Sequence, residues 1–131
     1  MRQVITGDIP GSSLPFSPAV RAGDLVFVSG QASVDDSGSY LPDDFDGEFR
    51  RSMDNVRRIL RAAGGTLDDV VQVRAYLSDA ADLAAFNTAY AEQFQPPYPA
   101  RTTIITGLGG LKFEVDVVAH LPNRPPGTGG S

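Results

Sequence analysis

The chain has 131 residues, of which 41% are hydrophobic and 21% charged, as in ordinary soluble globular proteins. The length fits one domain, and the formal net charge of −5 argues against a nucleic-acid-binding surface, which needs many Lys and Arg contacts to phosphate. No apolar run approaches the roughly 20 residues of a membrane helix, and no cysteine is present to form a disulfide, a thiolate metal site or a nucleophile. Without an apolar signal segment, these features predict a cytoplasmic protein.

The first predicted strand is an apolar run. Residues 24–30 (DLVFVSG) are nearly continuously apolar and end at Gly30. A run of this kind predicts a strand buried on both faces. The next segment, 31–42, is rich in Ser, Asp and Gly and predicts a loop or a hairpin.

An amphipathic helix follows this segment. Apolar residues recur at steps of three and four, with charged residues between them, and Gly64 and Gly65 supply a stop. The stripe consists of Phe45, Phe49, Met53, Val56, Leu60 and Ala63. Residues 66–69 (TLDD) have the spacing of a capping box and predict a single turn.

The second half of the chain repeats the strand and helix pattern. Residues 70–77 predict a strand whose 71/73/75/77 face meets the helices. Ser78 and Asp79 offer N-caps for a second helix, and two further strands are predicted over 99–105 and 112–117. The second helix is marked by Leu83, Phe86, Tyr90 and Phe94, and ends before Pro96 and Pro97. We therefore expect one domain over 1–121 and a disordered Pro/Gly-rich tail over 122–131.

The order β–β–α–β–α–β–β predicts an α+β fold, a mixed β-sheet covered on one face by two helices. The other face of this sheet would keep apolar residues: Val26, Val28, Val70, Ile104 and Ile105. Because such a face is not stable in water, we expect several copies to pack sheet to sheet in an oligomer.

Charged residues lie inside two of the predicted strands. Arg101 belongs to the strand over 99–105, whereas Glu114 and Asp116 share a face of the next strand. A charge within an apolar strand costs free energy unless it is paired, and the planar guanidinium matches the two oxygens of a carboxylate. From these residues alone, Arg101 forms either a structural ion pair across a subunit interface, with Asp116 or Glu114, or a contact with a substrate carboxylate.

Other candidate sites find little support. The lone His120 has no His, Cys or acidic cluster near it in the sequence, which argues against a metal site. The Gly-rich residues 107–110 lack the following Lys-Ser/Thr of a phosphate loop.

Five segments, in order and with compatible spacing, resemble the Rid family, also called the YjgF family. The resemblance runs from about Pro15 to Leu121. The segments are 15–20 (PFSPAV) with 22–31 (AGDLVFVSGQ), 54–56 (DNV), 62–64 (AAG), 86–90 (FNTAY) and 99–101 (PAR).

The resemblance implies a chorismate-mutase-like fold, a homotrimer with a central β-barrel, and three clefts between neighbouring subunits. It implies hydrolysis of reactive 2-imino or 2-enamino acids to 2-oxo acids and ammonia, with no cofactor or metal. By resemblance, Arg101 grips the substrate carboxylate and Glu114 orients the attacking water. Ser29, Gly30 and Asn87 line the cleft, and the backbone amide of Thr103 is a further contact.

Three positions depart from the family pattern and leave alternatives open. Phe16 replaces the usual cleft tyrosine, Thr103 replaces a common cysteine, and the loop 107–111 is shorter and lacks its usual proline. The alternatives are a specialised deaminase for an aminoacrylate-type enamine, and a trimer that binds small 2-oxo acids or regulates a partner with little turnover. Endoribonuclease activity is the weakest alternative, because the chain is acidic and has a single histidine.

Overall fold

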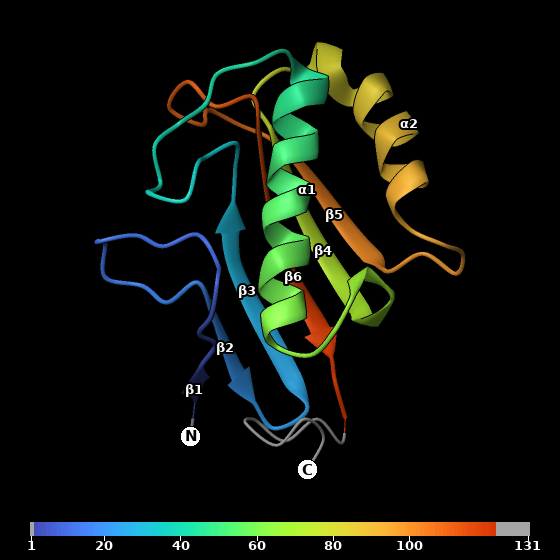
Figure 1. Cartoon of the computed structure of the whole chain (residues 1–131). Coiled ribbons are helices and arrows are strands. Elements are labelled where there is room, and N and C mark those ends of the chain that lie inside the picture. The colour runs from blue at the N-terminus through green and yellow to red at the C-terminus, as the bar shows by residue number, and fades with distance from the viewer. Residues whose placement is uncertain (1, 123–131) are drawn as a thin grey trace.

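The computed structural model describes residues 2–122 (Figure 1), so the predicted tail lies outside the described residues from position 123 onward. The strands are β1 (Gln3–Val4), β2 (Ala19–Ala22), β3 (Leu25–Gln31), β4 (Val70–Leu77), β5 (Ala100–Ile105) and β6 (Phe113–His120). The α-helices are α1 (Phe45–Ala62) and α2 (Leu83–Gln93), and 3₁₀ turns span Leu67–Asp69 and Ala80–Asp82.

The strands form one mixed sheet in the order β1-β2-β3-β6-β4-β5. β4 and β5 are parallel, and the other neighbouring strands are antiparallel. Both helices lie on the same face of the sheet, with α1 across its middle and α2 beside β5 (Figure 1). The predicted α+β architecture is therefore confirmed.

The ends of α1 follow from local chemistry. The side chain of Asp44 accepts a hydrogen bond from the backbone N–H of Gly47 at 2.8 Å and caps the helix. Gly64, just beyond the other end, has a φ of 91°, a left-handed conformation that favours glycine. The capping box predicted at Thr66 is also present, around the 3₁₀ turn Leu67–Asp69. The predicted stop after α1 and the predicted capping box at Thr66 are confirmed, whereas the Asp44 cap was not predicted.

Aromatic side chains join the helices to the sheet. The ring of Phe113 on β6 lies 5.0 Å from that of Phe49 on α1 and 5.6 Å from that of Phe86 on α2, between ring centroids. All three side chains are almost fully buried. Because these pairs add about 0.5–1.5 kcal/mol each beyond area burial, they fix both helices on one face of the sheet.

The prediction that β3 is buried on both faces is wrong for the single chain. Val26 and Val28 are buried, whereas the intervening Phe27 is 41% exposed. The helices cover only one face of the sheet, so alternate residues of β3 point away from the core. Val26 and Val28 thus belong to the core and not to the open face.

An irregular pairing of β4 changes which of its residues face the helices, compared with the predicted 71/73/75/77 face. Val73, Ala75 and Leu77 are buried as expected, but Val71 is 47% exposed. The pairing of β4 with β6 is irregular between residues 70 and 72, so that Val70 is buried in place of Val71. Val70 is therefore a core residue. Ile104 and Ile105 are both exposed, but only Ile104, in register with Tyr76, lies on the open face as predicted, because Ile105 is in register with the buried Leu77.

Two shorter features complete the comparison. The strand β1 was not predicted, because two residues carry no periodic signal. Within the predicted loop or hairpin, an isolated bridge joins Val34 and Tyr40.

Candidate functional site

Arg101 is held at the edge of the sheet by α2. In the register of β4 and β5 it lies opposite the buried Val73, on the face that the helices cover. Its guanidinium carbon lies 4.9 Å from the ring centroid of Phe86 and 4.7 Å from that of Tyr90. One terminal nitrogen donates a hydrogen bond to Oδ1 of Asn87 at 2.9 Å. The guanidinium is therefore fixed by two rings and one amide.

The remaining donors of Arg101 have no acidic partner among the residues that the structure describes. Between residues 2 and 122, no carboxylate lies within ion-pair distance of this guanidinium, and the residue is exposed. A guanidinium carries five N–H donors in a fork that matches a carboxylate. The arrangement can bind a small carboxylate from solution.

Thr103 lies two residues further along the same face, opposite Ala75. Its hydroxyl is buried and has no hydrogen-bond partner within the described part of the chain, and the same holds for the hydroxyl of Tyr90. Burial raises the pKa of Tyr90, while the nearby charge of Arg101 lowers it by a smaller amount. Arg101, Asn87 and Thr103 together form what we call the arginine group.

Glu114 lies on β6, opposite Tyr76 of β4. Burial raises the pKa of its half-buried carboxyl group, and the negative charge of Asp116 raises it further. Gly30 is packed against this carboxyl group: a Cβ added at Gly30 would lie 2.5 Å from Oε2 of Glu114. A raised pKa makes the carboxyl group a stronger base once ionised, which favours a role in proton transfer.

Ser29 precedes Gly30 on β3, and Phe16 lies across a hollow that Gly30 also lines. The hydroxyl of Ser29 donates to the carbonyl of Ser17 at 2.6 Å, and its backbone N–H donates to the carbonyl of Pro18 at 2.9 Å. The exposed ring of Phe16 borders a hollow of about 300 Å³, which Gly30 also lines. We call Phe16, Ser29, Gly30 and Glu114 the glutamate group.

The two groups lie on opposite faces of the sheet. Arg101 is in register with Val73, on the helix-covered face, whereas Glu114 is in register with Tyr76, on the open face. The strand β4 also separates β5 from β6. One chain therefore does not bring Arg101 and Glu114 to the same small ligand.

Asp116 is already paired within the chain. One of its oxygens accepts from Nε of Arg74 and the other from the hydroxyl of Tyr76, both at 2.8 Å. Within the described chain, Asp116 therefore does not act as the partner of Arg101. The alternation of polar residues along β4 was the available sequence signal for this cluster.

Sequence reasoning also missed the ring platform beneath Arg101. Phe86 and Tyr90 were assigned to the apolar stripe of the second helix, and both are indeed buried. Their spacing of four residues around Asn87 places both rings and the amide on one side of α2. That spacing, just before an arginine-bearing strand, was the available signal.

Residues 2–122 offer neither a cluster of metal ligands nor a membrane-spanning helix. In this range no group of three or more His, Cys, Asp or Glu side chains could hold a metal ion. Neither helix in the same range combines the length and apolar character needed to cross a membrane.

The fold and the two groups define an α+β protein with an exposed arginine, stacked on two aromatic rings, at one edge of the sheet. The model of a family described as Endoribonuclease L-PSP matches residues 6–121. Protein mmf2, mitochondrial, of Schizosaccharomyces pombe is 38% identical over 110 residues, covering 80% of this chain and 86% of that protein. The RutC family protein YjgH of Escherichia coli is 38% identical over 112 residues, covering 83% and 85% respectively.

Solved structures agree with these matches. The crystal structure of RidA from a Psychrobacter species superposes with a TM-score of 0.84 at 31% identity, covering 91% of this chain and 99% of that one. The chain therefore belongs to the YjgF/Rid family, and the resemblance seen in the sequence is confirmed.

Proposed function

We propose that this protein hydrolyses 2-imino and 2-enamino acids to 2-oxo acids and ammonia, in a cleft between two copies of the chain. The observation that carries the proposal is the guanidinium of Arg101, held over two rings with donors left for a carboxylate. Membership of the YjgF/Rid family supports it.

The arginine group would bind the substrate. In this proposal, Arg101 takes both oxygens of the substrate carboxylate, and the backbone amide of Thr103 adds a donor. Because the Arg101 side chain is restrained before binding, little further ordering is needed when the ligand arrives. The bound acid would present its planar C=N carbon to the opposite side of the cleft.

The glutamate group would handle the proton transfers. Water adds to the C=N carbon, the nitrogen gains a proton, and the resulting carbinolamine collapses to a C=O group as ammonia leaves. Glu114 would orient the water, accept its proton and pass a proton to the nitrogen. The raised pKa of Glu114 supports this role, because it makes the carboxylate a stronger base toward the attacking water.

A second copy of the chain is needed to complete this site. Arg101 and Glu114 lie on opposite faces of one chain, so the proposal assigns each to a different subunit. The exposed apolar side chains of Leu25 and Phe27 support burial of the open face by another copy. We propose the homotrimer with a central barrel that the family resemblance implies, which acts in the cytoplasm on small anionic imino or enamino acids and binds the 2-oxo acids that they yield.

The departures at two positions favour a second candidate function. Phe16 offers no hydroxyl to bond a substrate or water, and the buried hydroxyl of Thr103 stands where a thiol is common. A trimer that binds 2-oxo acids or regulates a partner, with little turnover, would fit these residues. A specialised aminoacrylate-type deaminase differs from the main proposal only in its substrate. The net charge of −5 disfavours endoribonuclease activity, despite the description of the family model.

The deciding test is the release of ammonia and 2-oxo acid from imino acids that an amino-acid oxidase generates in situ. Arg101→Ala should lower kcat/KM at least about tenfold, because it removes charge-assisted hydrogen bonds worth about 1.5–3 kcal/mol. Arg61→Ala is the matched control, since it removes an exposed arginine from α1.

Each outcome of this test has a definite meaning. Equal activity of wild type and Arg101→Ala would remove Arg101 from the mechanism. A wild type that is inactive over a panel of side chains, yet binds 2-oxo acids, would favour the binding trimer.

A further inference from the structure

Glu48 is a buried acid that belongs to neither group of the proposed site. It lies in the first turn of α1, and its side chain has no exposed area. Burying a carboxylate costs free energy unless hydrogen bonds and charges replace the water it loses. The donors that satisfy the Glu48 carboxylate come from residues outside α1.

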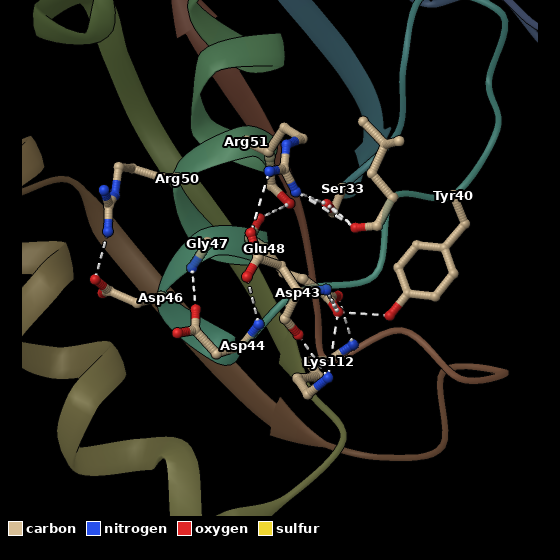
Figure 2. A network of polar contacts seen from close by, with 12 residues as sticks. Ser33, Tyr40, Asp43, Asp44, Asp46, Gly47, Glu48, Arg50, Arg51 and Lys112 are labelled. Atoms are coloured by element: carbon tan, nitrogen blue, oxygen red, sulfur yellow. Dashed lines mark hydrogen bonds and ion pairs between the residues drawn. The ribbon is translucent and has the colours of Figure 1, made fainter.

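Two neighbouring segments satisfy the Glu48 carboxylate (Figure 2). Its Oε2 accepts from the hydroxyl of Tyr40 at 2.5 Å and from the backbone N–H of Asp43 at 3.3 Å. Its Oε1 accepts from the backbone N–H of Lys112 at 3.0 Å, and Nζ of Lys112 lies 3.5 Å from Oε2. Both oxygens are therefore occupied by donors.

The electrostatics keep Glu48 ionised. Burial alone would raise its pKa, but the hydrogen bonds from Tyr40, Lys112 and Asp43 together hold the pKa of Glu48 below its ordinary value. The same contact raises the pKa of Tyr40 to about 12, so that the phenol remains a donor. The position in the first turn of α1 also favours a negative charge.

The contacts of Glu48 join two segments of chain. Tyr40 and Asp43 belong to the segment 32–44, between β3 and α1, whereas Lys112 ends the segment 106–112, between β5 and β6. The hydroxyl oxygen of Tyr40 also lies 3.1 Å from the carbonyl oxygen of Gly110. A single carboxylate thus holds both segments against the start of α1.

Both segments lie next to residues of the glutamate group. Gly38 of the first segment and Leu111 of the second line the hollow of about 300 Å³ that Phe16 and Gly30 also border. Lys112, whose backbone is bonded to Glu48, precedes Glu114 by two residues. No contact of Glu48 among the described residues reaches Asn87, Arg101 or Thr103.

We propose that Glu48 is a positioning residue, which fixes the entry into β6 and the adjoining hollow so that Glu114 faces the substrate. This inference rests on the proposed function. It assigns Glu48 to the proton-transfer half of the site and not to the carboxylate-binding half. Glu48 does not touch the substrate.

The kinetic test compares Glu48→Gln and Tyr40→Phe with the control Asp46→Asn. Asp46 lies in the same turn of α1, but its side chain is exposed and forms a surface ion pair with Arg50. Glu48→Gln should lower kcat about tenfold or more, and Tyr40→Phe about threefold, in line with the loss of charged and single hydrogen bonds. KM should change less than about twofold in both, because Arg101 is untouched. Asp46→Asn should match wild type.

A second readout does not depend on turnover. The titration of the Glu114 carboxyl carbon, followed by NMR on folded protein, reports how closely the surrounding chain encloses that group. In Glu48→Gln the pKa of Glu114 should fall toward its ordinary value as water gains access, while in Asp46→Asn it should stay raised.

The outcomes separate the two proposals. Folded Glu48→Gln with unchanged kcat and unchanged Glu114 titration would reduce Glu48 to a structural residue. A fall in kcat with an equal rise in KM would also overturn the inference, since the carboxylate-binding half would then be affected. An inactive wild type would count against the proposed function, and the titration would still decide the role of Glu48. If Glu48→Gln does not fold, Tyr40→Phe, which removes one oxygen atom, carries both measurements.

Discussion

At the scale of single residues, Glu114 carries an electrostatic cost in the folded protein. Its carboxyl group is half-buried beside Asp116, and both burial and that neighbouring charge raise its pKa. Gly30 leaves just enough room for the group, since any larger residue would meet Oε2 of Glu114. The ionised form of Glu114 is therefore disfavoured in the folded state, so ionisation of this group should lower the stability of the protein.

The folded pKa of Glu114 lies above its ordinary value of 4.5. The contribution of this group to the free energy of unfolding is therefore fully present below pH 4.5 and is lost as the pH rises through the folded pKa. Glu114→Gln carries no charge and escapes this loss. We expect the margin by which its melting temperature exceeds that of wild type to grow as the pH rises above 4.5 and to level off above the folded pKa of Glu114.

Thermal melts of both proteins across this pH range measure that margin. Glu92→Gln, which removes an exposed glutamate from α2, should show no comparable trend. A constant offset for Glu114→Gln, or lower stability at high pH, would mean that the ionised carboxylate is well solvated or paired in the native protein.

At the scale of single elements, the N-terminal cap of α1 positions the turn that contains Glu48. Asp44 caps its first turn by accepting from the backbone N–H of Gly47, and that turn presents the buried Glu48. Asp44→Ala should lower the free energy of unfolding by about 0.5–2 kcal/mol, the usual worth of an N-cap.

Urea denaturation would measure this loss. Asp54→Ala is a suitable control, because it removes an exposed aspartate from the middle of the same helix together with its surface ion pair to Arg57. Such pairs contribute little, so the control should lose less than about 1 kcal/mol. Equal losses in the two variants would show that the cap is not what stabilises the start of α1.

The elements also show which parts of the fold the sequence could predict. The stripe and stop signals of α1 lie within one helix, so local periodicity sufficed to predict it. The burial of β3 and β4 depended instead on which face the helices cover and on an irregular pairing near Val70. Those features arise between elements, and no window of sequence contains them.

The same limit applies to the candidate site. Arg101 and Glu114 were identified from residue type and family resemblance, and both lie on the predicted strands. Their placement on opposite faces follows from the registers of β4 with β5 and β6. The role of Phe86 and Tyr90 beneath Arg101 depends likewise on how α2 packs beside β5.

At the scale of the whole molecule, the opposite-face arrangement makes a prediction that a self-contained site would not. If one subunit supplies Arg101 and its neighbour supplies Glu114, then Arg101→Ala and Glu114→Gln each inactivate every cleft. A mixed oligomer, however, contains clefts that draw Arg101 from the second variant and Glu114 from the first. With equal amounts and random assembly, one half times one half of the clefts are intact, so about a quarter of wild-type activity should return.

Co-refolding of the two inactive variants, followed by the imine-hydrolysis assay, would measure this recovery. Arg101→Ala mixed with a chain carrying both substitutions is the control, because no cleft in that mixture contains Arg101 and none should recover. Recovery in the first mixture alone would establish that the cleft is shared between subunits. Absence of recovery, with mixed oligomers verified by mass, would require both residues to act within one chain. The placement of Arg101 and Glu114 on opposite faces of the sheet, with β4 between their strands, argues against that arrangement.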